Sequence, residues 1–304
     1  MKWKRGAKSR DVIDIRGASK RSSGGGSGLP IPGGIGSIGG GAGLIVILVV
    51  LGISLLGGEE EGGFELPGAF GTGATAPGAE RPQPLPPGQD PQADLKDFSA
   101  YVFDDAQDVW AATFRDGGRR WEDAQLVLYS GAVQTGGCGG ASSAVGPFYC
   151  PADQRVYIDL SFYEDMRRRL GASGDFAWAY VIAHEMGHHV QRLTGTSSEV
   201  DRLSRSDPGD ANELSVRQEL QADCYAGVWA STVFAAGDLE AGDLEEAFGA
   251  AEAVGDDRLQ ERATGRVDPD SFTHGTSEQR RSWFDRGYRS GDPTTCDTFG
   301  VAEL

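Results

Sequence analysis

The stretch VIAHEMGHHVQ, residues 181–191, holds three of the four histidines of this 304-residue chain. His184 and His188 are four residues apart, a spacing that places both imidazoles on one face of a helix, within reach of a single cation. Glu185 follows the first histidine, so its carboxylate can meet a water molecule beside the metal instead of binding the metal itself. The H-E-x-x-H pattern therefore predicts one catalytic Zn²⁺ held by the two histidines, with Glu185 as the general base.

A surface helix with scattered histidines is the alternative to a metal site. The apolar residues Ala177, Tyr180, Val181 and Val190 surround the motif. They indicate a buried helix, and buried histidines need partners. We therefore favour the metal site, which needs a third protein ligand because a catalytic zinc takes three and leaves the fourth position open.

The third ligand is expected on the next predicted helix. The metzincin pattern is excluded because Gln191 and Thr194 stand where that pattern needs Gly and His. Downstream, Glu219 and Asp223 are again four residues apart and share a helix face. We expect Glu219 to bind zinc and Asp223 to accept a hydrogen bond from the second ring nitrogen of a zinc histidine. A solvated acidic pair is the alternative.

The two remaining histidines have less defined roles. His189 lies about 100° around the helix from His188, so we expect it to pack beside the site without binding the metal. His274, in SFTHGTSEQR, is a candidate donor to the oxyanion that develops during peptide hydrolysis. A structural role for His274 is an equal alternative.

The cysteines indicate an oxidising compartment. The chain has no C-x-x-C pair, which argues against a thiolate zinc site, and an even number of cysteines is typical of disulfides. Of the three possible pairings we favour Cys138 with Cys150 and Cys224 with Cys296. Four buried thiols in a cytosolic protein are the alternative.

Charge is divided unevenly along the chain. Residues 1–21 carry eight basic and two acidic side chains, whereas the whole chain has a formal net charge of −17. The strongly acidic remainder disfavours nucleic acid as a partner. Residues 22–58 contain no charged side chain, and within them residues 35–58 are long enough to cross a bilayer as a helix. A cleavable signal peptide is the alternative to this anchor.

These patterns predict a membrane-anchored α+β protein, mostly helical with a small sheet. By the positive-inside rule, the leader lies in the cytoplasm and the acidic domain outside. The predicted parts are a basic, Gly-rich cytoplasmic leader (1–34), a transmembrane helix (35–58), a disordered Pro/Gly linker (59–94) and the zinc domain (95–304). Alternating or apolar runs predict strands at 124–131 and 154–162. Helical spacing predicts helices from about residue 95 and over 175–193, 211–235, 243–263 and 276–288. A capping box is expected at Asp210/Glu213, and Ser277 or Thr276 is expected to cap the last helix.

Several motifs beyond HEMGHHVQ carry a family resemblance. They include GCGGASSAVGPFYCPADQRVYIDLSFY (137–163), LSVRQELQADCYAGVWA (214–230) and DSFTHGTSEQRRSWF (270–284). With them the chain resembles the bacterial neutral zinc metallopeptidases, single-span membrane proteins related to the gluzincins. The resemblance implies a zincin-like fold with His184, His188 and Glu219 on zinc and Glu185 as the base. Zincins align substrate on an edge strand, and we expect RVYIDL (155–160) to be that strand.

The expected function is hydrolysis of peptide bonds by zinc-activated water. The expected partners are a peptide or protein substrate and the bacterial cell membrane, crossed once with the N-terminus in the cytoplasm and the catalytic domain outside. A zinc-stabilised, non-catalytic membrane scaffold or binding protein is one alternative, and a hydrolase of non-peptide substrates such as cell-wall material is another. The sequence defines neither the natural substrate nor the oligomeric state.

Overall fold

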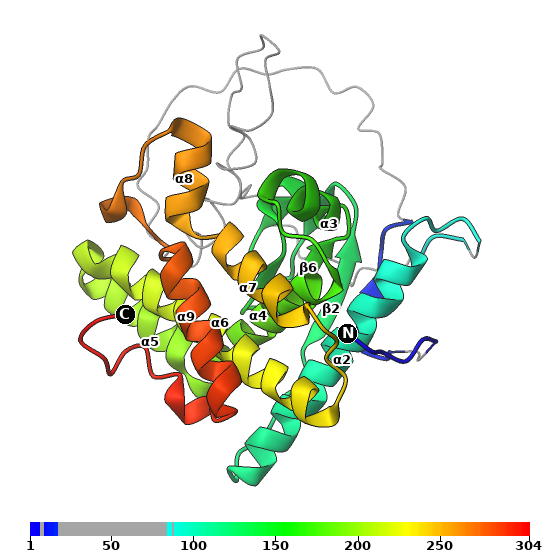
Figure 1. The fold of residues 1–304 in the computed structure, drawn as a ribbon, viewed down its shortest axis with the longest axis horizontal. Helices are drawn as coiled ribbons and strands as arrows, with labels where there is room; N and C mark the ends of the chain where they lie inside the picture. Colours follow the sequence, from blue (N-terminus) through cyan, green and yellow to red (C-terminus); the bar gives the residue numbers. More distant parts are fainter. Residues whose placement is uncertain (7–8, 18–83, 87) are drawn as a thin grey trace.

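The computed structural model describes residues 1–6, 9–17, 84–86 and 88–304. This part of the chain is mostly helical with a small sheet, which confirms the α+β class. Helices α6, α7 and α9 gather on one side, and the sheet and α2 lie on the other (Figure 1). The helices are α2 (Ala93–Asp116), α3 (Phe162–Asp165), α4 (Asp175–Thr194), α5 (Thr196–Ser206), α6 (Ala211–Ala236), α7 (Asp243–Ala253), α8 (Asp256–Thr264) and α9 (Ser277–Ser290).

The predicted membrane segment, residues 35–58, lies outside the described residues. So do residues 7–8 and 18–34 of the predicted leader and most of the predicted linker. Within the described ranges, none of the helices combines the length and the apolar character needed to cross a bilayer.

The main sheet has four strands in the order β1-β2-β6-β5. Strands β1, β2 and β6 are parallel, and β5 runs antiparallel to β6. A separate hairpin joins β3 to β4. The strands are β1 (Val12–Asp14), β2 (Gln125–Tyr129), β3 (Ala132–Gln134), β4 (Gly140–Ser142), β5 (Phe148–Cys150) and β6 (Arg155–Asp159).

The expected role of RVYIDL as a substrate-aligning edge strand is wrong. These residues form β6, which pairs with β2 on one side and with β5 on the other. The backbone groups on both edges of β6 are therefore already hydrogen-bonded, and β5 is the edge strand next to it. The apolar run correctly predicted a buried strand, but its place in the sheet depends on long-range pairing, which periodicity does not encode.

Part of the predicted leader forms a strand of the main sheet. Val12–Asp14 form β1, and Val12 pairs with Leu126 of β2. The β-branched Val12 and Ile13 pack on opposite faces of the sheet, against the two hydrophobic clusters of the fold. A strand pair consists of direct backbone hydrogen bonds, so this part of the leader is held against the sheet of the domain.

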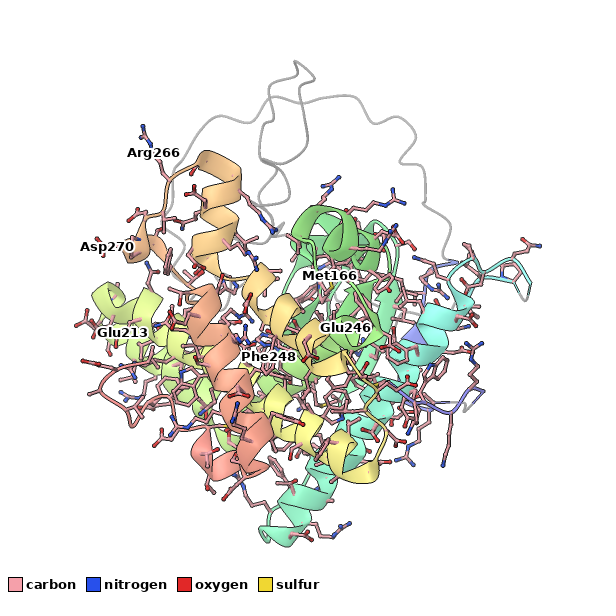
Figure 2. All side chains as sticks on the ribbon, viewed as in Figure 1. Met166, Glu213, Glu246, Phe248, Arg266 and Asp270 are labelled. Atoms are coloured by element: carbon pink, nitrogen blue, oxygen red, sulfur yellow. A yellow bond between two sulfur atoms is a disulfide. The ribbon has the colours of Figure 1, made fainter. Side chains whose placement is uncertain are left out.

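Helices α4 and α6 match their predicted positions. Helix α4 follows Gly174, and Glu246 of α7 accepts a hydrogen bond from the N–H of Phe176 in its first turn (Figure 2). Helix α6 starts where predicted, but its capping box is absent: the side chain of Asp210 makes no cap bond, and Glu213 pairs with Arg217 at 2.8 Å.

The C-terminal helices differ from the sequence pattern at one point. The predicted helix 243–263 is divided into α7 and α8 at Gly255, whose backbone lies so close to Ser277 that a Cβ would be 2.3 Å from the Ser277 nitrogen. The linker between α8 and α9 follows the surface, where Arg266 and Asp270 project outward (Figure 2). Thr276, one of the two predicted caps, caps helix α9 and forms a capping box with Gln279.

Both favoured disulfides are confirmed. Cys138–Cys150 closes the loop that contains β4 and leads into β5, and Cys224–Cys296 ties the C-terminal tail to α6. With sequence separations of 12 and 72 residues, the chain-entropy model gives stabilisations of about 3 and about 4 kcal/mol. The second bond is the larger constraint, and it fixes α6 at the residue next to Asp223.

Helix α4 approaches α6 closely because residue 187 is glycine. A Cβ at Gly187 would lie 2.9 Å from the carbonyl oxygen of Ala222 on α6 and 3.1 Å from its Cα. Glu219 is one helical turn before Ala222, so this contact sets how near Glu219 comes to the histidines of α4.

Replacing Gly187 with Ala is expected to push α4 and α6 apart. We expect a loss of about 1–3 kcal/mol in the free energy of unfolding, measured by urea denaturation, and weaker zinc binding in a competition titration. Gly249→Ala is the matched control, because its new Cβ meets nothing within 4 Å; it should stabilise the protein by about 0.5–1 kcal/mol. Equal behaviour of the two variants would contradict this account of the helix contact.

Candidate metal centre

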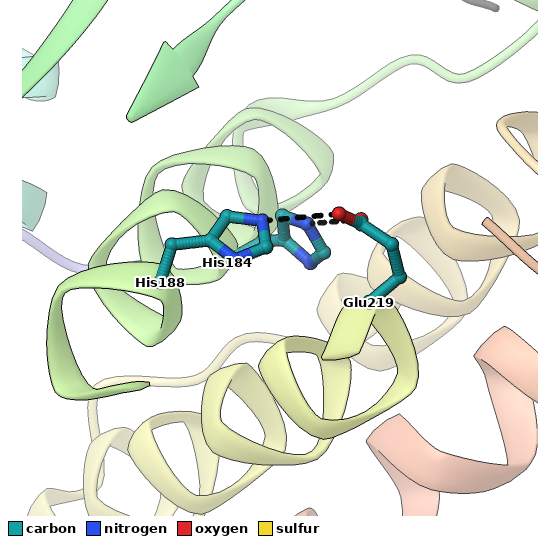
Figure 3. A group of neighbouring side chains, drawn as sticks. All are labelled: His184, His188 and Glu219. Atoms are coloured by element: carbon teal, nitrogen blue, oxygen red, sulfur yellow. Dashed lines mark hydrogen bonds and ion pairs between the residues drawn. The ribbon is translucent and has the colours of Figure 1, made fainter. Parts of the chain in front are cut away.

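Three side chains converge between α4 and α6. His184 and His188 project from α4 toward Glu219 of α6 (Figure 3). The Nε2 atom of His184 lies 3.1 Å from Glu219 Oε2, and that of His188 lies 3.4 Å from Glu219 Oε1. The two imidazole rings are nearly perpendicular, with centroids 4.8 Å apart. The structure thus brings together the three residues that the sequence analysis assigned to zinc.

The spacing of these atoms fits a tetrahedral zinc ion. Zinc bonds to nitrogen and oxygen are about 2.0–2.2 Å long, so two ligands on one tetrahedron are about 3.3–3.5 Å apart. The candidate ligand atoms all lie within 4.8 Å of one another. Glu219 Oε1 is buried without a hydrogen-bond partner, as is Glu185 Oε2, and a cation with an associated water molecule would satisfy both. The residues present therefore fit the ion.

Charge at the centre also favours a cation. Burial acts to lower the pKa of His184, but Asp223 and Glu219 beside it raise this pKa to about 10. The charge of His188 and a hydrogen bond from His184 outweigh burial and lower the pKa of Glu219. The buried carboxylates thus stabilise positive charge between α4 and α6.

His184 is oriented by Asp223. Its Nδ1 donates to Asp223 Oδ1 at 2.8 Å, which leaves Nε2 free to face Glu219. The hydroxyl of Tyr180 donates to the same carboxylate oxygen at 2.5 Å. Asp223 therefore lies where the sequence placed it, in contact with the second ring nitrogen of a candidate ligand.

His188 is oriented by a residue that sequence reasoning did not assign. Its Nδ1 donates to Gln191 Oε1 at 2.9 Å, and the amide nitrogen of Gln191 donates to the backbone carbonyl of Gln218 at 2.7 Å. Gln191 is fully buried. It fixes the ring orientation of His188 and also connects α4 to α6.

Arg280 of α9 is a second unassigned contributor. Its guanidinium grips the Asp223 carboxylate through Nε at 2.8 Å and Nη2 at 3.0 Å, and it also donates to the Tyr180 hydroxyl at 3.2 Å. The residue is only 3% exposed. Helices α9 and α6 pack closely enough for Arg280 to reach Asp223. They can do so because residue 287 of α9 is glycine: a Cβ there would overlap the backbone carbonyl of Cys224 on α6. Arg280 thereby holds Asp223 as a carboxylate aimed at His184.

Removing this guanidinium is expected to weaken zinc binding. Arg280→Met leaves the buried Asp223 charge without its main partner, so we expect a loss of about 3–5 kcal/mol in stability and about 10–100-fold in zinc affinity. Arg280→Lys should recover part of both. The matched control is Arg281→Met, since Arg281 is exposed and pairs with Glu252 at the surface. Equal zinc affinities of Arg280→Met and Arg281→Met, measured against a competing chelator, would contradict this role.

A cavity of about 540 Å³ opens beside the candidate metal centre. It is lined by His184, Glu185, His188 and Glu219 together with apolar residues such as Phe148 and Val181. Glu185 is buried, and this burial raises the pKa of its carboxyl group. A general base facing a cavity of this size can meet both a water molecule and an extended substrate.

His274 lines the same cavity. Its Nδ1 lies 3.3 Å from Asp256 Oδ1. Asp256 also accepts hydrogen bonds from the backbone N–H groups of Thr273 and His274, at 2.7 and 2.6 Å. Burial acts to lower the pKa of His274, but contact with Asp256 and the charge of Glu219 raise it. The 274 loop therefore reaches the candidate metal centre, and Asp256 is a further contributor that the sequence analysis did not assign.

His189 faces away from the three candidate ligands. Its Nε2 donates to the backbone carbonyl of Glu122 at 2.7 Å, and its Nδ1 accepts from the hydroxyl of Tyr149 at 2.8 Å. Burial lowers its pKa, consistent with this neutral tautomer. The ring also packs edge-on against Trp121. His189 thus joins α4 to strand β5.

Comparison with known proteins places these residues in a family. The profile of the family described as "Putative neutral zinc metallopeptidase" matches residues 1–299. The Escherichia coli K12 protein named "Uncharacterized protein YpfJ" is 47% identical over 301 residues, which cover 99% of each chain. "Uncharacterized protein Rv2575" of Mycobacterium tuberculosis H37Rv is 48% identical over 190 residues, 59% of this chain and 63% of that protein. Among solved structures, none matches the chain significantly.

Proposed function

The chain belongs to this family of neutral zinc metallopeptidases, and on that premise we propose that it is a zinc-dependent peptidase with a zincin-like active site. The observation that carries the proposal is the convergence of two histidines and one glutamate beside a cavity that also contains Glu185. Within the described part of the chain, this group offers three protein ligands. A catalytic zinc uses three ligands, whereas a structural zinc uses four.

Glu185 acts as the general base in this proposal. When bound, zinc would supply the Lewis acid that lowers the pKa of a water molecule to about 7 and polarises a substrate carbonyl. The Glu185 carboxylate accepts the proton of the attacking water and later passes it to the leaving amine. Burial of Glu185 supports both proton transfers, because it raises the pKa of the carboxyl group toward the pH at which the enzyme works.

His274 is the proposed donor to the developing oxyanion. It lines the cavity, and its Nδ1 lies 3.1 Å from the Thr273 hydroxyl and 3.3 Å from Asp256 Oδ1, so we assign the proton donated to the substrate to Nε2. Contact with Asp256 favours the charged imidazolium, the stronger donor to an anion.

The substrate is proposed to bind as an extended peptide along β5. This strand ends the sheet on the cavity side, and Phe148 and Tyr149 of β5 line the cavity. An exposed strand edge pairs with a peptide backbone through main-chain hydrogen bonds. Apolar lining residues, including Val145, Phe162 and Val181, favour apolar side chains in the substrate.

Cleavage of an unfolded protein tests the proposal. Purified protein should cleave reduced, unfolded casein or a mixed peptide library, lose activity with a chelator and regain it with added zinc. Zinc binding without cleavage of any peptide would instead favour the non-catalytic scaffold. Zinc-dependent release of fragments from cell-wall material, but not from peptides, would favour the non-peptide hydrolase.

The location of the protein is proposed from two features. The disulfides favour an oxidising compartment outside the cytoplasm for the domain. Membrane attachment through residues 35–58 stays a prediction of the sequence.

A further inference from the structure

We infer that the described leader residues, 1–6 and 9–17, are a structural part of the metal-site domain, and that leader and domain share the oxidising compartment in which the disulfides form. The inference does not depend on the proposed peptidase activity. It reverses the cytoplasmic placement that the basic charge of the leader predicts.

Backbone pairing is the first support. Strand β1 matches three consecutive residues of β2 in parallel register, from Val12 with Leu126 to Asp14 with Leu128. Leu126 N–H donates to the carbonyl of Asp11 at 2.8 Å, and Ile15 N–H donates to that of Leu128 at 2.9 Å. Hydrogen bonds of this length cannot form across a hydrocarbon layer of about 30 Å.

A buried ion cluster is the second support. Arg16, whose side chain is 1% exposed, lies 2.7 Å from Asp14 and 2.6 Å from Asp90. Asp90 precedes α2, so this cluster joins the described residues on either side of 18–83. A buried guanidinium needs its carboxylates, because an unpaired buried charge is strongly unfavourable.

Side chains of the leader also contact α2 in a specific register. The hydroxyl of Ser9 donates to Asp104 at 2.6 Å, and Gln107 donates to Asp11 at 3.0 Å. The ring of Trp3 packs edge-on against Phe98, with centroids 5.4 Å apart. Each contact joins a side chain of the leader to α2, so the leader packs against the domain through specific side-chain contacts.

The leader also reaches the helix of the candidate metal ligands. The amino group of Met1 lies 2.9 Å from Asp175, in the first turn of α4, and 3.2 Å from Asp243 of α7. These two residues and Glu246 form the other acidic group among the described residues that could hold a cation. In this structure, that group already has a positive partner.

The disulfides identify the compartment. Ile13 and Ile15 pack against the hydrophobic cluster that contains Cys150, one half of the disulfide with Cys138. All four cysteines of the chain are paired. Since disulfides persist in oxidising compartments, leader residues that touch this cluster lie there too.

An engineered cross-link tests the shared compartment. Parallel neighbouring strands lie about 4.8 Å apart, within the Cα range of about 4.4–6.8 Å for disulfides. In bacterial cells that express the full chain, Val12→Cys with Leu126→Cys should form a third disulfide, seen as a mobility shift on non-reducing gels and confirmed by mass. The single variants are the controls. Two free thiols in a double variant that retains its thermal stability would overturn the inference.

Labelling from one side gives a second test that keeps the core intact. Lys4 and Arg115 are exposed on the leader and on α2. Lys4→Cys and Arg115→Cys, each as the single free thiol, should both react with a membrane-impermeant maleimide in intact protoplasts. Reaction at Arg115→Cys alone would overturn the inference, as would reaction of both variants only after permeabilisation.

Discussion

Glu185→Gln is expected to lower kcat for peptide hydrolysis by about 10²–10⁴-fold while zinc remains bound. The reason is that Gln keeps the size of the side chain but cannot accept a proton, and loss of a positioned general base costs about that factor. Glu185 lines the cavity and is not one of the three converging ligands. The measurements are initial rates on an unfolded protein substrate and zinc content by atomic absorption.

The comparison between wild type and variant separates chemistry from folding. Glu185→Gln should keep the zinc-dependent rise in thermal stability, because His184, His188 and Glu219 stay in place. Glu185→Asp is the second variant; it retains the carboxylate but shortens its reach, so its activity should lie between the other two. Unchanged kcat in Glu185→Gln would refute the proposed mechanism.

Glu219→Gln is expected to weaken zinc binding by about 10²–10³-fold. Binding free energies of about 10–16 kcal/mol for four-ligand zinc sites correspond to about 2.5–4 kcal/mol for each ligand. Glu219 is the only one of the three converging ligands that brings a negative charge, and it meets both histidines. The measurement is a competition titration with a fluorescent chelator.

A matched control lies on the same helix. Glu213 of α6 is exposed and pairs with Arg217, so Glu213→Gln removes the same charge without reaching the metal centre. It should leave zinc affinity within about twofold and stability within about 1 kcal/mol of wild type. The assignment of Glu219 as a ligand fails if the two variants bind zinc equally well.

The candidate site could be predicted largely because its geometry is local. His184 and His188 share one helix turn, as do Glu219 and Asp223, so spacing alone places each pair on one face. The contact between the two helices is not local, but Gly187 permits it from inside the motif itself. Helices α4 and α6 were predicted well because their apolar spacing is long and regular.

The residues that support the site could not be predicted in the same way. Arg280 is followed by another arginine, and nothing in the local pattern distinguishes the buried one from the exposed one. Asp256 lies in an acidic stretch that resembles a solvated surface. Gln191 served only to exclude another zinc motif. Each of these three residues acquires its role by contacting elements that are distant in sequence. Patterns in a single sequence carry no information on such contacts.

Strand β1, which the sequence analysis did not predict, has the same explanation. Strand β1 has three residues, lies within a basic leader and pairs with a segment far along the chain. Its charged surroundings are typical of a solvated segment, whereas the fold neutralises Arg16 with two partly buried carboxylates.

The pairing of β1 with β2 also affects how this protein can be made. Translation produces residues 12–14 about 110 residues before residues 125–129. The first strand therefore stays unpaired while the intervening residues are synthesised, and such distant contacts are slow to form. A nascent fragment without residues 125–129 cannot pair its first strand, and one without residues 277–290 has no Arg280 to bind Asp223.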